Sequence, residues 1–408
     1  MLIKNQKEID FIKGISVIKN AYFVYLYNSR QIRDVELFCC CNTNPVPLGV
    51  DTTFNLCDLW LTDTSYQNQR LLKMSDGKNP VFLGPFMFHF TKNADVFSRF
   101  YLELRAGNPG LKDLKAVGVD MEAAIYNGFH VHGPEIKRLI CVRHLKARDE
   151  NKALKLLAKT SKTSSQQAKA KYEVINDIYG ERIGTSYEYG IVESLDKDDL
   201  CLKLDSLKDK WNALIPGFHT WFIENRKEMF VNSVIDSARK DIKVDGLFYQ
   251  NDVESLHHVE KCIQGFKKED VLQVIRNLKR LSDRQDAEEV RALYGAGSYV
   301  LSRQYSKFKV ESSRWHSWNE DRRKDHVRKF RDYTPVLSDD FSKPKNSGRK
   351  PSNQQRNKSA PPDIIEDRHG NLTTLCNNHS SSTESSTNSI RFKDPRYVEI
   401  VALIKLLL

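Results

Sequence analysis

Two short segments, VDTTF at residues 50–54 and GVDME at residues 118–122, decide the fold of this chain. Each places an aspartate directly after an apolar run, VPLGV before Asp51 and LKAVGV before Asp120. Apolar runs of this length beside glycine are typical of buried strands. Because a buried, unpaired carboxylate is strongly unfavourable, each aspartate is expected at an open strand end or beside a cation. The alternative is that each is a helix N-cap or a turn residue, where aspartate is favoured.

The segments around these aspartates predict a definite order of elements. Three consecutive strands are expected, followed by helix, strand, helix, strand and helix. The strands are expected at residues 46–50, 59–66, 81–90, 115–119 and 138–142, with a further short extended segment at 35–38. A helix is predicted over 96–104, where apolar residues recur with 3.6-residue spacing before a Gly-Asn-Pro-Gly stop at 107–110.

This order predicts an α/β fold with a mixed sheet flanked by helices. It is the order of a ribonuclease H-like fold, in which the first and fourth strands are central neighbours. Such a pairing would bring Asp51 and Asp120 together despite their separation in sequence.

Composition divides the 408-residue chain into segments. Trp211 and Trp221, in the helical stretch, are expected to be ordinary core residues, because an indole buries a large apolar area. The Ser-, Asn- and Lys-rich linker is expected to be disordered. The expected segments are a short lead-in at 1–34, an α/β domain at 35–270 with a helical insertion at about 146–245, a helical and basic extension at 271–335, the linker at 336–392 and a short apolar terminus at 393–408.

The charge of the chain favours an anionic partner. A net charge of +11 and a pI of about 9.1 favour nucleic acid first and an acidic membrane second, the alternative being a lysine-rich solvated surface. Between residues 137 and 171, eleven basic residues face only Asp149 and Glu150. We expect this stretch to contact a DNA backbone. The residues expected to bind DNA are Arg143, Lys146, Arg148, Lys152 and Lys155.

A second run of alternating aromatic and basic residues lies between Tyr305 and Lys329. Aromatic residues interleaved with cations suit nucleic-acid contact. The alternative is an amphipathic element that docks on the core and leaves a solvated basic face.

No targeting signal is recognised in the sequence. Charged residues interrupt any signal-peptide core in the first twenty positions, and the apolar stretch at 397–408 is too short to span a bilayer. Eight cysteines, three of them adjacent at 39–41, do not form a secreted disulfide framework. We expect a reducing compartment, the nucleus after cytoplasmic synthesis, and no membrane partner.

Six segments, in order and at plausible spacing, resemble the transposase domain of Mutator-like elements. They are VDTTFNL, GPFMFHF, GVDMEAAIYNGF, CVRHLK, KWNALIPGFHTWF and NDVESLHH. The resemblance covers roughly residues 35–330. It implies a ribonuclease H-like catalytic core with an Asp-Asp-Glu triad at Asp51, Asp120 and Glu254, and a long helical insertion before the glutamate.

The triad implies metal-dependent phosphodiester chemistry. Hard Mg²⁺ or Mn²⁺ ions prefer carboxylate oxygens, and two such ions can stabilise the attacking and leaving oxygens of an in-line displacement. By the resemblance, Asp51 would bridge both ions, while Asp120 and Glu254 would each complete one. Water would nick the DNA, and the freed 3′-hydroxyl would attack target DNA. Glu254 has an alternative interpretation, a first-turn glutamate of a helix with no further role.

Cys141 and His144 match the Cys-x-x-His signature of the family. They are interpreted either as half of a zinc site or as a buried structural cysteine beside a site-lining histidine. The second interpretation is favoured because no second ligand pair stands at a convincing spacing in the sequence.

Three functions stay open from the sequence. They are an active DNA transposase, a degenerate or domesticated DNA-binding protein without catalysis, and a structure-specific ribonuclease H-like nuclease. Full-length relatives carry a DNA-binding module before the catalytic core, whereas here a short lead-in without a Cys/His ligand set precedes it. Weak DNA sequence preference is therefore expected. A homodimer or a higher oligomer on DNA stays open.

Overall fold

The fold is taken from a computed structural model of the chain. Glu254 and the expected segments at 336–392 and 393–408 lie outside the residues that it describes. The described residues are 11–18, 21–244, 246–249, 259–263, 265 and 267–335.

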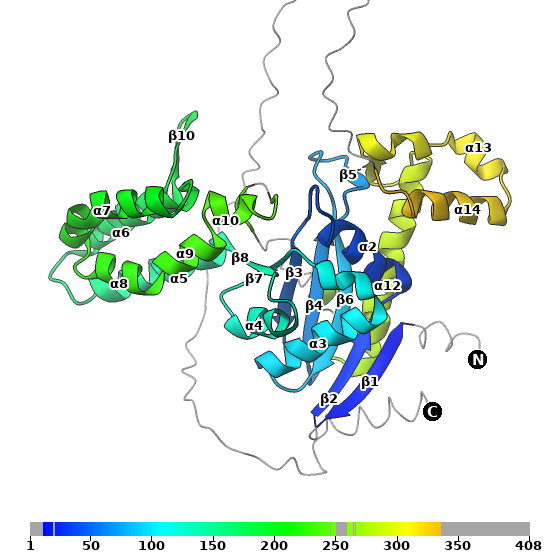
Figure 1. Ribbon diagram of the computed structural model, residues 1–408, viewed down its shortest axis with the longest axis horizontal. Coiled ribbons are helices and arrows are strands. Elements are labelled where there is room, and N and C mark those ends of the chain that lie inside the picture. The colour runs from blue at the N-terminus through cyan, green and yellow to red at the C-terminus, as the bar shows by residue number, and fades with distance from the viewer. Residues whose placement is uncertain are drawn as a thin grey trace, which may run out of the picture. The chain divides into compact units, whose positions relative to one another are not determined.

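A seven-stranded mixed sheet forms the centre of the fold, with strand order β1-β2-β6-β4-β3-β7-β8 (Figure 1). β3, β7 and β8 run parallel to one another, and the remaining neighbours are antiparallel. The five predicted strands are confirmed, and so is the pairing of the first with the fourth. The strands are β1 (Ile12–Ile18), β2 (Ala21–Leu26), β3 (Leu48–Thr53), β4 (Trp60–Gln67), β6 (Val81–His89), β7 (Ala116–Val119) and β8 (Lys137–Ile140).

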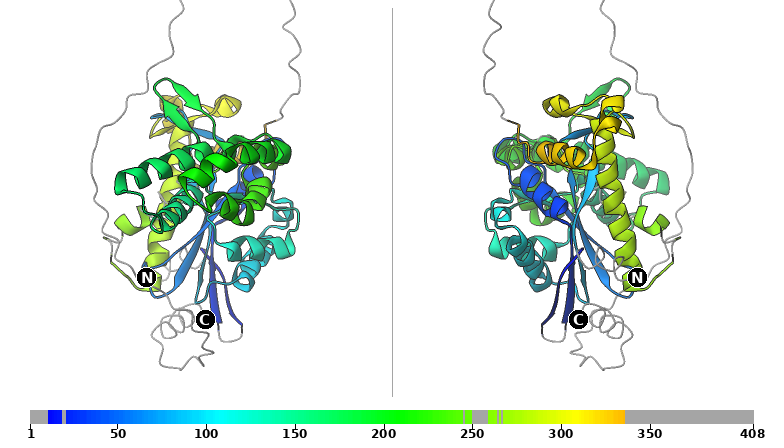
Figure 2. Two further views of the ribbon diagram at one scale, coloured as in Figure 1. Left: turned by 90° about the vertical axis from the view of Figure 1, so that its left-hand side faces the viewer. Right: turned by 90° about the vertical axis from the view of Figure 1, so that its right-hand side faces the viewer.

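Helices cover both faces of this sheet (Figure 2). On one face, α2 (Ser29–Cys39), α3 (Ala94–Gly107) and α4 (Ala123–His132) share a hydrophobic core with β3 and β7. On the other face, α12 (Val271–Leu293) packs on β2, β4 and β6. The expectation of a mixed sheet flanked by helices is therefore confirmed.

Helix α3 forms as its sequence predicts. The five apolar residues at helical spacing are all buried, and the side chain of Asn93 caps the helix by accepting a hydrogen bond from the Val96 N–H at 3.0 Å. The helix ends before Asn108, and Pro109 begins the short helix η1 (Pro109–Asp113). Both ends therefore follow from local sequence.

The expectation of an extended segment at 35–38 is wrong. These residues lie in α2, which begins with a capping box between Asn28 and Gln31 and buries Val35 and Phe38. Four residues are too few to separate a helical from a strand period. The boundary expected at residue 35 falls inside this helix, and the lead-in supplies β1 and β2 to the same sheet.

The insertion is helical, with its own hydrophobic core around Trp211, Phe218, Phe222 and Phe230. Trp211 is fully buried, as expected, whereas Trp221 is half-buried. A small hairpin, β9 (Glu181–Ile183) with β10 (Ser186–Glu188), interrupts the helices. The other elements are α5 (Val142–Leu157), α6 (Ser164–Tyr179), η2 (Ile191–Glu193), α7 (Lys197–Leu214), α8 (Phe218–Asn225), α9 (Lys227–Ser233) and α10 (Asp236–Lys240).

The segment after α12 forms a small helical unit with a core of Leu293, Tyr305, Val310, Trp315 and Phe330. A two-stranded sheet joins it to the chain after β4, because β11 pairs with β5. None of the helices among the described residues combines the length and the apolar character needed to cross a bilayer. The elements of this unit are β5 (Leu71–Lys73), β11 (Tyr299–Leu301), η3 (Arg303–Phe308), α13 (Ser312–Ser317) and α14 (Glu320–Arg331).

Candidate active site

The register of the parallel strands places Asp51 beside Asp120. β3 and β7 pair with Gly49 opposite Gly118, so two residues further along each strand the two aspartates occupy neighbouring positions. Neighbouring strands lie about 4.8 Å apart, and residues opposite each other project from the same face. Asp120 directly follows β7, as predicted. Asp51 lies inside β3 rather than after it, because the β-branched Thr52 and Thr53 continue the strand.

Local hydrogen bonds orient both carboxylates. Asp51 Oδ1 accepts the Thr52 N–H at 2.8 Å, and Asp120 Oδ1 accepts the Glu122 N–H at 2.6 Å. The second bond makes Asp120 a turn residue that leads the chain into α4, which was the alternative interpretation. A carboxylate offers about four acceptor positions, so one such bond is compatible with a metal ligand.

A third aspartate, Asp63, lies beside Asp51 and was not predicted. It lies directly opposite Asp51 in the antiparallel β3–β4 pair and is fully buried. The pairing therefore places two carboxyl groups on the same face of the sheet. The sequence carried a signal for it, because Asp63 is the only charged residue in the strand WLTDTSYQ.

Cys141 lies at the same ends of the parallel strands as the two aspartates. β7 and β8 pair with Val119 opposite Ile140, so Cys141 neighbours Asp120, and its N–H donates to the Val119 carbonyl at 3.0 Å. The Cys141 side chain is buried at the start of α5, and His144 follows three residues later on the same helix face. Within the described part of the chain, no group of three or more His, Cys, Asp or Glu residues is arranged to hold a metal ion.

A neutral hydrogen-bonded chain supports the strands from the other face of the sheet. The Thr52 and Thr62 hydroxyls lie 3.3 Å apart, and the Thr62 hydroxyl lies 2.7 Å from His89 Nε2. His89 Nδ1 lies 2.8 Å from the Thr91 carbonyl, which can only accept, so Nδ1 carries the proton and Nε2 accepts from Thr62. Burial lowers the pKa of His89 to about 4, so this histidine is neutral at physiological pH.

Two basic side chains lie close to the end of β7. Arg138 Nη2 is 3.5 Å from the Asp120 carbonyl oxygen, and burial lowers the pKa of Arg138 below its ordinary value. Lys92 forms a 2.6 Å ion pair with Glu122. Glu122, the carboxylate nearest to Asp120 in sequence, is therefore already neutralised.

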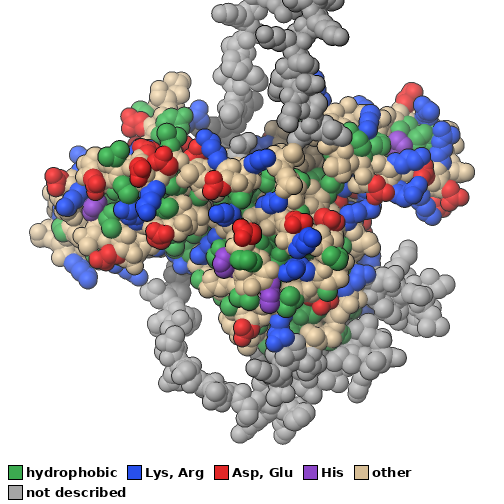
Figure 3. Space-filling view, in the orientation of Figure 1, with side chains coloured by type: hydrophobic (Ala, Val, Ile, Leu, Met, Phe, Trp, Pro, Cys, Tyr) green, Lys and Arg blue, Asp and Glu red, His purple; other side chains and the backbone are tan. Residues whose placement is uncertain are grey.

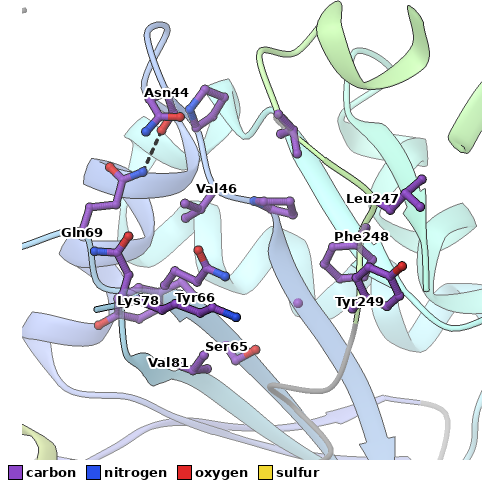
Figure 4. Close-up of a pocket in the computed structure, with 16 residues that line it drawn as sticks. Asn44, Val46, Ser65, Tyr66, Gln69, Lys78, Val81, Leu247, Phe248 and Tyr249 are labelled. Atoms are coloured by element: carbon purple, nitrogen blue, oxygen red, sulfur yellow. Dashed lines mark hydrogen bonds between the residues drawn. The ribbon is translucent and has the colours of Figure 1, made fainter. Parts of the chain in front are cut away.

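A cavity of about 470 Å³ opens at the start of β3, and none of the three aspartates lines it. Gly49 and Ser65 line it, and each lies two positions along its strand from Asp51 or Asp63. Phe248 closes one side and Lys78 lies on the other (Figure 4). Gly118 is required here, because a Cβ at this position would overlap the Phe248 ring.

The five residues expected to bind DNA all lie on α5. Arg143, Arg148 and Lys155 are exposed. Lys146 and Lys152 are half-buried, with their ammonium groups 5.9 Å and 5.3 Å from the centres of the Tyr179 and Trp221 rings. These two lysines therefore pack within the insertion as well as carrying charge.

Asp149 anchors this helix inside the insertion. It is fully buried, accepts a 2.7 Å ion pair from Arg226 Nε and accepts a 2.6 Å hydrogen bond from the Tyr179 hydroxyl. Burial raises the pKa of Asp149, and the opposing charge of Arg226 only partly offsets it. The basic residues of α5 are thus presented on a fixed helix.

No protein-family model matches this chain, and no curated protein matches it.

Proposed function

We propose that this protein is a metal-dependent enzyme that cleaves and transfers DNA strands, with a ribonuclease H-like fold and a site of the Mutator-like transposase type. The observation that carries the proposal is the β3–β7 register, which sets Asp51 beside Asp120. The strand order β6-β4-β3-β7-β8 supports it, because two parallel strands there follow an antiparallel meander.

Two residues, Asp51 of β3 and Asp120 just after β7, are of the type that a hard divalent cation prefers as ligands. Carboxylate oxygens are the preferred ligands of Mg²⁺ and Mn²⁺, and Asp51 and Asp120 present theirs from neighbouring strands. Asp63 lies on the same face as Asp51, but among the described residues the three aspartates are not arranged as a three-ligand metal site. By the resemblance, Glu254 completes the ligand set, but it lies outside the described residues.

When bound, two such ions would stabilise the attacking and leaving oxygens of phosphodiester cleavage. The described residues of the chain hold and orient the two aspartate side chains. Strand pairing fixes Asp51, and the turn at Glu122 fixes Asp120. Cleavage breaks a P–O bond and frees a 3′-hydroxyl, which then serves as the nucleophile of strand transfer.

Cations on α5, of which Arg148 and Lys155 are exposed, would hold the DNA backbone. Arg148, Lys152 and Lys155 follow one another at spacings of four and three residues, so they share one stripe of the helix. Contacts to phosphates release counterions, so we expect affinity to fall steeply as salt rises.

The test is nicking of supercoiled DNA by the purified full chain with Mg²⁺ or Mn²⁺, and with EDTA as the metal-free control. We expect nicking that Asp51→Asn and Asp120→Asn both abolish. The matched control is Asp76→Asn, which removes an exposed carboxylate in the turn between β5 and β6. A wild-type protein that binds DNA but never nicks it would leave the alternative, a non-catalytic DNA-binding protein derived from a transposable element.

A further inference from the structure

A basic groove lies far along the chain from the carboxylates, between η3 and α14. It has a volume of about 440 Å³, within the range of about 300–1,000 Å³ typical of ligand sites. Its basic and aromatic lining is Lys307, Lys309, Arg314, Trp318, Arg322 and Lys329. We call this surface the η3–α14 groove.

The groove stands on a rigid base. Tyr305 of η3 and Phe330 of α14 are buried together in the core of the small helical unit, with ring centres 5.8 Å apart. His326, on α14, lies 2.9 Å from the Phe308 carbonyl through Nε2. Because both walls are fixed by buried contacts, the charged groups on them keep their spacing.

The lining is strongly positive, with five Lys or Arg residues against two carboxylates, Glu311 and Asp325. Asp325 is already engaged by Arg328 at 2.6 Å and Lys329 at 2.7 Å. Among the described residues, the other four cations form no ion pair with a carboxylate. These four are Lys307, Lys309, Arg314 and Arg322, and all are exposed.

This pattern differs from the rest of α14. Lys324 pairs with Glu320 at 2.6 Å, and Arg331 pairs with Glu289 at 2.7 Å. Uncompensated cations therefore gather at the groove rather than over the whole helix. The space-filling view shows Lys and Arg side chains collected over α13 and α14 (Figure 3).

Aromatic rings hold the cations in place. The Arg322 and Arg314 guanidinium groups lie 4.5 Å and 5.9 Å from the Trp318 ring centre, and Lys307 Nζ lies 3.3 Å from the Tyr333 ring centre. A guanidinium stacked on a ring keeps its N–H edge available for two parallel hydrogen bonds to a phosphate.

We propose that the η3–α14 groove binds the phosphodiester backbone of duplex DNA, as an anchor separate from the carboxylate site. Repeated phosphates match a row of fixed, unpaired cations, and backbone contact needs no base-specific side chain. The proposal goes beyond the cleavage function above and stands without it, because backbone binding requires neither the metal nor the aspartates.

The experiment measures binding of the full chain to a labelled duplex of mixed sequence in EDTA, across a salt series. The groove variant replaces four cations with glutamine, at Lys307, Lys309, Arg314 and Arg322. We expect its affinity to fall at least about tenfold, and the slope of log affinity against log salt to flatten by about 3 to 4, since each phosphate contact contributes about 0.9.

The matched control removes the same charge from exposed positions elsewhere, at Lys112, Arg182, Lys197 and Lys208. It should change the salt slope by less than about 1. Equal losses in both variants would overturn the proposal, since net charge alone would then explain binding. Wild-type affinity in the groove variant would also overturn it.

Two further measurements keep the result interpretable. A single Lys309→Glu change, at an exposed position, should weaken DNA binding even if the four-fold variant fails to fold. Binding is also measured to vesicles of anionic phospholipid. A groove variant that loses vesicle binding while keeping DNA binding would assign the groove to a membrane and sink the DNA proposal.

Discussion

Two groups of buried or half-buried acids lie in the same sheet domain, and they differ in whether arginines of the chain form a network with them. The edge site consists of Asp51, Asp63 and Asp120, brought together by strand register. The buried ion network consists of three acids and three arginines. Its members are Asp34, Asp286 and Glu289 with Arg30, Arg70 and Arg331.

In the network, each acid is matched by arginine. Arg70 is fully buried and lies 2.8 Å from Asp34 and 3.2 Å from Glu289. Glu289 also accepts a 2.7 Å ion pair from Arg331, and the Tyr66 hydroxyl donates to Asp34 at 2.9 Å. These contacts join α2, the chain after β4, α12 and α14.

The electrostatics of the network agree with this geometry. Burial opposes the charge on Asp34, but the Arg70 and Arg30 guanidinium groups outweigh it and hold the pKa of Asp34 below its ordinary value. The same balance, with Arg331 and Arg70 as the partners, lowers the pKa of Glu289. Asp34 and Glu289 are thus held in their charged forms, whereas burial raises the pKa of Asp286.

The difference separates two uses of buried charge. Arginines supplied by the chain make the network a structural clamp, whose members stabilise one another. In the edge site, strand register instead sets Asp63 opposite Asp51 on one face of the sheet. Carboxylates that strand register gathers at the ends of β3 and β7, outside a network closed by arginines, are candidates for function. Each prediction below tests this division.

The largest expected effect is on activity at the edge site. Asp51→Asn should lower metal-dependent nicking by about ten-thousand-fold, the scale seen when one member of a catalytic group is removed. Its free energy of unfolding should change by less than about 1 kcal/mol, because asparagine keeps the shape of the side chain and can still accept the Thr52 N–H. Nicking rates and urea unfolding measure the two. A loss of more than about 2 kcal/mol in stability would place Asp51 in the structural class.

In the buried ion network, a substitution should mainly lower stability. Arg70→Met should lower the free energy of unfolding by about 3–5 kcal/mol, because two buried carboxylates lose a partner. The matched control is Arg33→Met, whose pair with Asp332 is exposed on both sides and should contribute less than about 1 kcal/mol. Denaturant unfolding compares the two variants. Similar, small losses in both would contradict the clamp.

Stability should depend on pH through His89, which is hydrogen-bonded to Thr62 on the opposite face of the sheet from Asp51 and Asp63. The pKa of His89 is lowered to about 4 from an ordinary 6.5, so the unfolded chain binds this proton first as pH falls. Stability should be greatest above pH 6.5 and fall by about 3 kcal/mol on approaching pH 4.

Unfolding free energies measured between pH 7 and pH 4.5 test the role of His89. The control is His89→Gln, which removes the titrating group and should flatten the dependence in this window. An equally steep dependence in the variant would assign the effect to other groups.

The smallest expected effect concerns DNA affinity. Asp120→Asn removes a negative charge that would face phosphates, so duplex binding in EDTA should strengthen by about two- to five-fold. Fluorescence anisotropy measures the change, with Asp76→Asn as the control for net charge. Weaker binding than wild type would mean that the Asp120 carboxylate organises the DNA surface rather than repelling it.

Much of the sheet could be predicted from the sequence because its signals are local. The five strands β3, β4, β6, β7 and β8 and the helix α3 follow from apolar runs, periodicity and stop signals within a few residues. The nearness of Asp51 and Asp120 followed once the first and fourth strands were expected to pair. Segment 35–38 was misassigned because four residues carry too little periodicity to separate a helix from a strand.

Only the tertiary structure decided the remaining features. Asp63 joins the edge site through its register with Asp51, and register depends on how two strands pair rather than on either strand alone. Arg70 meets Glu289 across 219 positions of sequence, and no local pattern marks either residue as a partner. The sequence by itself determined where strands, helices and charges occur. Packing decided which charges meet, because contacts between distant segments form only when the sheet and its helices come together.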